Sequence, residues 1–124
     1  MNSETGNSKP SILHVCAREM IKPLRDQILM RQGYEVVSTL SVTDAFEMAL
    51  VRTFSLVLID VEGSNRVPLA EKLCSDIKHA QPDQKVAFIY NYRVAIESNC
   101  PDELIRAEFN PEEMVRGVKE MLNS

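Results

Sequence analysis

Short apolar runs alternate along the chain with stretches in which apolar residues recur every three or four positions. The runs are typical of strands covered on both faces, and the longer spacing is typical of helices that bury one side. The runs predict five strands, over residues 12–15, 34–37, 55–60, 86–90 and 103–106. The periodic stretches predict helices over about residues 20–32, after Ser41, around residues 69–77 and after Asn110.

Local signals support the helix boundaries. Ser41 and Asn110 are residue types that accept a hydrogen bond from a free N–H in the first turn of a helix. On the first helix, the spacing predicts that Ile21, Leu24 and Ile28 face the core.

Strands that alternate with helices through short links predict an α/β fold, with a mostly parallel sheet covered by helices on both faces. Ligands of such folds bind at the carboxyl ends of the strands, where the strand order reverses. We expect residues 1–10 to be a disordered lead and residues 11–124 to form one domain. Between the last two strands, residues 91–102 fit either an alternating strand or one helical turn.

Composition narrows the function classes for this chain of 124 residues. A net charge of −4 opposes a direct nucleic-acid surface and a polybasic membrane surface. No apolar stretch reaches membrane-helix length, so we expect a cytoplasmic protein. With 2 histidines and 3 cysteines that lack C-x-x-C spacing, neither a zinc site nor a disulfide framework is expected.

Asp60 is the main candidate for chemistry. It ends the most apolar strand, where an unpaired buried charge would be costly. A functional carboxylate explains this position, and so does a helix cap or an ion pair with a nearby arginine.

The residues at 12–15, 33–37, 56–60 and 109–114 together resemble a bacterial two-component response-regulator receiver domain. The resemblance implies a flavodoxin-like (βα)5 three-layer sandwich with strand order 2-1-3-4-5. It also implies that Asp60 accepts a phosphoryl group. In that family Mg²⁺ is held by this aspartate and by an acidic pair after the first strand, and a lysine and a hydroxyl residue hold the phosphoryl oxygens.

This chain departs from the family at each supporting position. The replacements are Cys16 and Ala17 at the acidic pair, Tyr90 or Asn91 at the hydroxyl, and Ala107, followed by Glu108, at the lysine. A single carboxylate is a poor Mg²⁺ site, because Mg²⁺ requires several hard oxygen ligands. We therefore expect no cofactor, with Mg²⁺ a weak alternative held by Asp60 and Glu62. The link between Tyr90 and the last strand is also several residues shorter than is usual in that family, which predicts a shortened or irregular fourth helix.

Arg18 follows the vacated acidic pair. Its guanidinium either reaches Asp60 and replaces the charge of the metal, or is solvated at a helix start. Cys16 is either a thiolate at a strand-to-helix turn or a buried, inert residue, and the second is favoured. His14 is expected to be a hydrogen-bonded core histidine. Cys74 and Cys100 receive no functional role.

The sequence thus indicates an atypical receiver domain, or pseudo-receiver, that acts mainly by binding a protein partner. A histidine kinase, another regulator and an output domain are the candidate partners, and a homodimer through the apolar positions of residues 92–96 is an alternative. We expect no enzyme activity beyond self-phosphorylation at Asp60. Two other functions stay open: a working phosphoacceptor, and a flavodoxin-like module that binds a small ligand or uses a thiol.

Overall fold

The computed structural model describes residues 9–91, 94, 96–107 and 110–123. Five parallel strands form one sheet in the order β2-β1-β3-β4-β5, as the resemblance implies. The strands are β1 (Ser11–Val15), β2 (Glu35–Thr39), β3 (Leu56–Asp60), β4 (Val86–Tyr90) and β5 (Glu103–Arg106). The helices are α1 (Lys22–Arg31), α2 (Val42–Val51), α3 (Val67–Ala80) and α4 (Pro111–Leu122), with a 3-10 turn, η2, at Ser64–Arg66.

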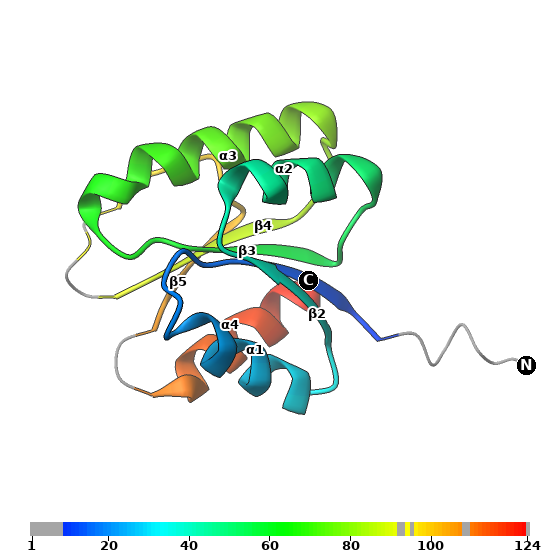
Figure 1. Ribbon diagram of the computed structural model, residues 1–124, viewed down its shortest axis with the longest axis vertical. Helices are drawn as coiled ribbons and strands as arrows, with labels where there is room; N and C mark the ends of the chain where they lie inside the picture. The colour runs from blue at the N-terminus through cyan, green and yellow to red at the C-terminus, as the bar shows by residue number, and fades with distance from the viewer. Residues whose placement is uncertain (1–8, 92–93, 95, 108–109, 124) are drawn as a thin grey trace, which may run out of the picture.

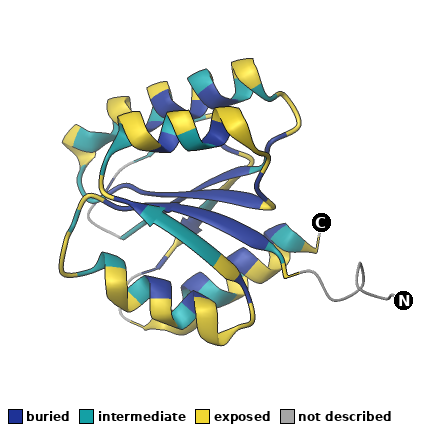
Figure 2. Ribbon diagram, turned by 45° about the vertical axis from the view of Figure 1, so that its right-hand side comes forward, coloured by how far each residue is buried: buried dark blue, intermediate teal, exposed yellow. Residues whose placement is uncertain are grey.

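The molecule has three layers. Helices α2 and α3 cover one face of the sheet, and α1 and α4 cover the other (Figure 1). Two apolar clusters follow from this arrangement, one on each face of the sheet. Figure 2 shows the central strands as buried and the outer sides of the helices as exposed. The sheet therefore holds the carboxyl ends of β1, β3 and β4 in fixed positions next to one another.

The predicted helix boundaries are confirmed where a side chain or a glycine marks them. Ser41 Oγ accepts the N–H of Asp44, and Asn110 Oδ1 accepts the N–H of Glu113. Gly33 follows α1 with a φ of 92°, a conformation that glycine adopts freely.

The predicted inner face of α1 is wrong at Leu24, which is 61% exposed, whereas Ile28 packs against the core as predicted. Asp26 and Leu29 are the buried residues of this helix. The helix is rotated because Asp26 points inward to His14 on β1, at 2.8 Å. A buried polar contact thus overrides the apolar spacing at Leu24.

The link between β4 and β5 contains no helix in its described part, residues 91, 94 and 96–102. Val94 is buried and Ile96 packs against the α2–α3 side of the core. These two positions therefore do not form an exposed apolar edge for a homodimer. The other positions of that hypothesis, Tyr92, Arg93 and Ala95, lie outside the described residues.

The expectation of no disulfide is wrong. Cys74 on α3 and Cys100 in the β4–β5 link form a disulfide, with their Cα atoms 6.3 Å apart. The two cysteines are 26 positions apart in sequence, so their spacing gave no motif. Cys16 is the free cysteine of the described residues and is buried.

Candidate functional site at the carboxyl ends of the strands

Asp60 lies where the resemblance places the acceptor carboxylate, at the carboxyl end of the central strand β3. Its side chain is 1% exposed. The neighbouring strand β1 ends at Val15, so the link from β1 to α1 begins beside it. This is the reversal of strand order at which α/β folds bind ligands.

Three groups crowd one oxygen of this carboxylate. Arg18 Nη2 donates a hydrogen bond to Asp60 Oδ2 at 2.9 Å. Arg25 Nη1 forms an ion pair with the same oxygen, also at 2.9 Å. The thiol of Cys16 donates to it at 3.1 Å. We call this arrangement the Asp60 cage: the Asp60 carboxylate with Arg18, Arg25 and Cys16.

A second carboxylate extends the ion pairs outward. Glu62 Oε2 lies 3.3 Å from Arg18 Nε, and Glu62 Oε1 lies 3.2 Å from Arg66 Nε. Arg18 therefore bridges Asp60 and Glu62. Three guanidinium groups meet two carboxylates, which leaves this strand end with one net positive charge.

The pKa values reflect this balance. Burial raises the pKa of the Asp60 carboxyl, but the charge of Arg25 and the hydrogen bond from Arg18 outweigh it and hold the pKa below its ordinary value. Burial and the charge of Asp60 raise the pKa of the Cys16 thiol to about 12. Asp60 is therefore ionised at neutral pH, and the buried thiol of Cys16 is protonated, which disfavours the thiolate interpretation.

Little room remains beside Asp60. The cavity that it lines, between the strand ends and helices α2 and α3, has a volume of about 20 Å³. A single water fills such a space. Apart from Asp60 and Arg66, its lining is mostly small or apolar, and includes Ala17.

The site does not fit a Mg²⁺ ion. Two guanidinium groups already compensate the charge of Asp60, and Glu62, the other candidate ligand, is paired with Arg18 and Arg66. The described residues contain no group of three or more histidine, cysteine or acidic side chains arranged to hold a metal. An added divalent cation would have to displace the arginines and would meet their repulsion.

The other predicted positions surround the site without adding a functional group to the Asp60 cage. Tyr90 ends β4 and packs against the core on the α2–α3 side. Its carbonyl accepts the N–H of Ala107, which is buried after β5. The carbonyl of Asn91 accepts the N–H of Val94. Glu108 lies outside the described residues.

Arg25 and Arg66 are the site residues that the sequence did not reveal, and Arg25 is the one that contacts Asp60. The N–H groups of Ile21 and Lys22 both donate to the carbonyl of Arg18, so a helical turn already begins there. Arg25, seven positions after Arg18, consequently lies two turns along on the same side. The seven-residue spacing between Arg18 and Arg25 is the sequence signal that could have identified Arg25 as a second partner of Asp60.

A buried polar network lies on the α1 side of the same sheet. Asp26 Oδ1 lies 2.8 Å from His14 Nδ1, and Asp26 Oδ2 accepts hydrogen bonds from Ser38 Oγ at 2.7 Å and from Lys22 Nζ at 3.3 Å. His14 is thus a core histidine with a polar partner, as expected. Its Nε2 atom has no hydrogen-bond partner within the described part of the chain. Because His14 and Asp26 are both buried, we assign this network to the fold.

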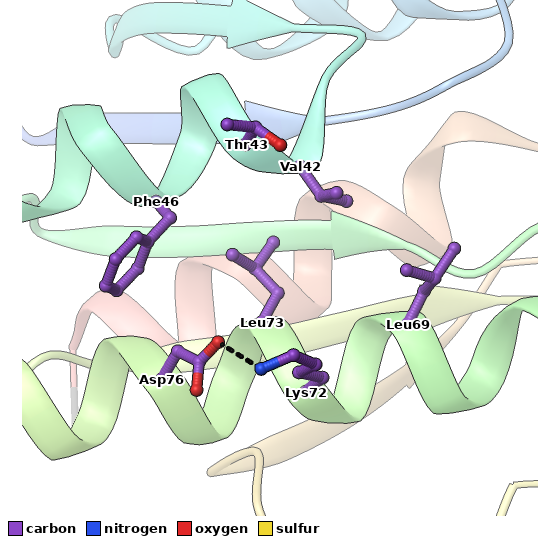
Figure 3. A pocket seen from close by; sticks show the side chains of 7 residues that line it. All are labelled: Val42, Thr43, Phe46, Leu69, Lys72, Leu73 and Asp76. Atoms are coloured by element: carbon purple, nitrogen blue, oxygen red, sulfur yellow. Dashed lines mark hydrogen bonds and ion pairs between the residues drawn. The ribbon is translucent and has the colours of Figure 1, made fainter.

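A separate hollow of about 210 Å³ lies between α2 and α3 (Figure 3). Its lining consists of Val42, Thr43, Phe46, Leu69, Lys72, Leu73 and Asp76. At its rim, Lys72 Nζ donates a hydrogen bond to Asp76 Oδ2 at 3.0 Å, so these two charged groups pair with each other. This hollow offers no convergent polar groups, and it shares Val42 and Leu69 with the small cavity beside Asp60.

Comparison with known proteins identifies the fold. No protein-family model and no curated protein sequence matches the chain. Solved receiver domains do match its structure: a CheY-like receiver domain protein from Methanospirillum hungatei has a TM-score of 0.76 at 22% identity, covering 94% of this chain and 95% of that one. A putative response regulator from Chloroflexus aurantiacus has a TM-score of 0.78 at 17% identity, covering 94% and 100%.

A third similar structure is a complex. The response regulator TrrA, solved together with the histidine kinase ThkA, has a TM-score of 0.76 at 24% identity, covering 91% of this chain and 98% of that one. The fold of this protein is therefore that of CheY-like receiver domains. No helix in the described residues has the length and apolarity needed to cross a membrane.

Proposed function

We propose that this protein is an atypical receiver domain of two-component signalling, which acts in the cytoplasm by binding a protein partner and does not depend on Mg²⁺ or phosphorylation. The Asp60 cage is the observation that carries this proposal. Arg18 and Arg25 supply the positive charge that a receiver takes from a metal ion. The site is thereby held in one charge state without a ligand.

The chemistry of phosphoryl transfer explains why the cage opposes it. Attack by a carboxylate requires a free lone pair in line with the phosphorus and charge stabilisation around the transferred group. Asp60 Oδ2 already contacts two guanidiniums and a thiol. The adjacent cavity of about 20 Å³ is too small for a phosphoryl group. The positions of the hydroxyl and the lysine hold Tyr90 or Asn91 and Ala107.

A surface next to the cage has the properties of a docking site. Two adjoining hollows of about 180 and 510 Å³ run between α1 and α4, share Ile28 and Pro111, and include the exposed Leu24. Basic residues edge the larger hollow: Arg31, Arg116 and Lys119, against one acidic residue, Glu112. An apolar floor with a basic rim suits an acidic, amphipathic helix. A histidine kinase, the class of protein with which TrrA was solved in complex, is one candidate partner.

Arg25 belongs both to the docking surface between α1 and α4 and to the Asp60 cage. It lines the smaller hollow and also forms the ion pair with Asp60. A partner that contacts Arg25 therefore senses whether the cage is closed. In this proposal the cage keeps the α1 side of the docking surface in its binding conformation.

The test is exposure of the folded protein to Mg²⁺ with beryllofluoride, and separately to Mg²⁺ with acetyl phosphate. Amide chemical shifts and intact mass are the measurements, and a receiver domain that has the full acidic pair is the positive control. We expect no saturable shift change around Asp60 and no added phosphoryl mass. Saturable changes that disappear in Asp60→Asn would overturn the proposal.

One observation favours the alternative of a working phosphoacceptor. Within the described residues, Asp60 Oδ1 has no hydrogen-bond or ion-pair partner. If the arginines swing away, this oxygen can attack a phosphodonor. The same experiment decides between the two functions, because only the alternative predicts phosphorylation. The thiol-based alternative has no comparable support, since Cys16 is buried and its pKa is raised to about 12.

A further inference from the structure

We propose that Cys74 and Cys100 form a reversible redox switch that fastens the β4–β5 link to helix α3. This proposal is independent of the Asp60 cage and of the function proposed above. It assigns a regulatory role to the link, whose described part, residues 91, 94 and 96–102, contains no helix. The oxidised protein holds residues 96–101 against α3, and the reduced protein releases them.

The geometry suits a disulfide between these two elements. The Cα–Cα distance of 6.3 Å lies within the range that disulfides span. Cys74 is fully buried on the inner side of α3, next to Leu73 in the core cluster of that face. Cys100 is partly exposed at the surface of the same cluster. The bond therefore connects the core to the outside of the link.

Few other contacts hold this part of the link. In the described structure, the one hydrogen bond of residues 96–101 runs from the N–H of Cys100 to Ser98 Oγ, inside the link itself. The next firm anchor is Asp102, which accepts from Lys78 Nζ at 2.7 Å and from the N–H of Val86 at 2.8 Å. Between Val94 and Asp102, the fixed position of the chain thus depends on the disulfide, on the packing of Ile96 and Cys100, and on the burial of Pro101 next to Asp102.

The difference in exposure sets the order of the chemistry. An external thiolate, such as that of glutathione, attacks the sulfur of Cys100 first, because Cys100 is the partly exposed residue of the pair and Cys74 is fully buried. Its attack breaks the S–S bond, leaves a mixed disulfide on Cys100 and releases Cys74 as a thiolate that takes a proton. A second glutathione thiolate then frees Cys100. Overall two electrons and two protons reach the protein, and two glutathiones become one glutathione disulfide.

Release of the link changes the edge of the molecule next to β5. Leu104 on β5 packs against the same core cluster as Ile96 and Cys100. When residues 96–101 move away, this apolar side chain and the sulfur atoms gain exposure. A surface at the β4–β5 edge is therefore present in two forms, selected by the thiol–disulfide balance around the protein.

The first experiment equilibrates the full chain in glutathione buffers of graded redox ratio, then traps free thiols in denaturant and counts them by mass spectrometry. We expect one trapped thiol, Cys16, in oxidising buffer and three in reducing buffer. Peptide mapping should assign the two additional thiols to Cys74 and Cys100. Three free thiols in every buffer, or only one in every buffer, would overturn the proposal of a reversible switch.

The second experiment measures amide hydrogen exchange in both states. We expect exchange in residues 96–101 to be roughly tenfold faster in the reduced protein, with β1 and β3 unchanged. The matched variants Cys100→Ser and Cys74→Ala should show the fast exchange in either buffer. Equal protection of the link in both states of the natural chain would refute the switch, even if the disulfide itself were reducible.

Discussion

Asp26 and Asp60 are two buried carboxylates held by cations, yet they serve the protein differently. Asp26 uses both oxygens, and its partners His14, Ser38 and Lys22 come from β1, β2 and α1 itself. Asp60 has all its described partners on one oxygen and lies at a strand end beside a small cavity. The first is fully satisfied inside the fold, and the second is neutralised at a position where α/β folds carry out chemistry.

Helix α1 connects these two sites through neighbouring residues. Arg25 pairs with Asp60, and Asp26 pairs with His14. The orientation of α1 is consequently set by two polar contacts, and Leu24 is left exposed. Polar contacts, more than the apolar stripe, therefore determine which residues α1 exposes on its outer side.

The substitution Asp26→Asn should give the largest loss of stability among single changes at these two sites. It removes the charge that compensates Lys22 and leaves the buried amide with mismatched partners. We expect the free energy of unfolding to fall by about 3 kcal/mol, as is typical when one partner of a buried pair is removed. Urea unfolding followed by circular dichroism measures this. A loss no greater than that of Asp60→Asn would remove the distinction between the two carboxylates.

The sign of the effect of Asp60→Asn tests the cage directly. Where several acids crowd together to hold a metal, neutralising one of them relieves repulsion and stabilises the fold. Here the carboxylate faces two arginines, so we expect a loss of about 2 kcal/mol. Equilibrium unfolding in metal-free buffer is the measurement. A gain in stability would show that the arginines do not compensate Asp60 in solution.

The two arginines should contribute unequally to the cage. The Arg25 side chain is 17% exposed and that of Arg18 is 34% exposed, so solvent screens the Arg18 pair more strongly. We expect Arg25→Met to cost about 1.5 kcal/mol and Arg18→Met less than 1 kcal/mol. Double-mutant cycles with Asp60→Asn isolate each pair. Equal coupling energies would contradict the ranking.

The sequence predicted most of the fold because its signals are local. Strand β4 has the predicted bounds, since buried parallel strands appear as short apolar runs. The edge strand β5 also has the predicted bounds, although Glu103 and Arg106 at its ends are exposed. Ser41 and Asn110 mark helix starts through a contact with a residue three positions away. The inner face of α1 was not predictable in this way, because the contact between Asp26 and His14 joins two elements.

The candidate site was only partly predictable for the same reason. Asp60 was identified from one strand, and the hypothesis that Arg18 reaches it is confirmed at 2.9 Å. Arg25 was missed because a charged residue on a predicted helix is ordinarily solvated. The pairing of Cys74 with Cys100 was missed because it depends on how α3 and the β4–β5 link meet in space.

The smallest expected effect is a difference in acid sensitivity between the natural chain and Asp60→Asn. The pKa of Asp60 is lowered in the folded state, so the folded protein binds fewer protons than the unfolded chain as the pH falls towards the ordinary aspartate value, near 3.8. The stabilisation from Asp60 is present above that value and is lost as the pH falls through the lower folded value. Asp26 and Asp102, whose pKa values are also lowered, give the same trend in both proteins. We therefore expect the unfolding free energy to decline less steeply below about pH 4 in Asp60→Asn. Parallel declines would mean that Asp60 titrates normally and that the cage is open in solution.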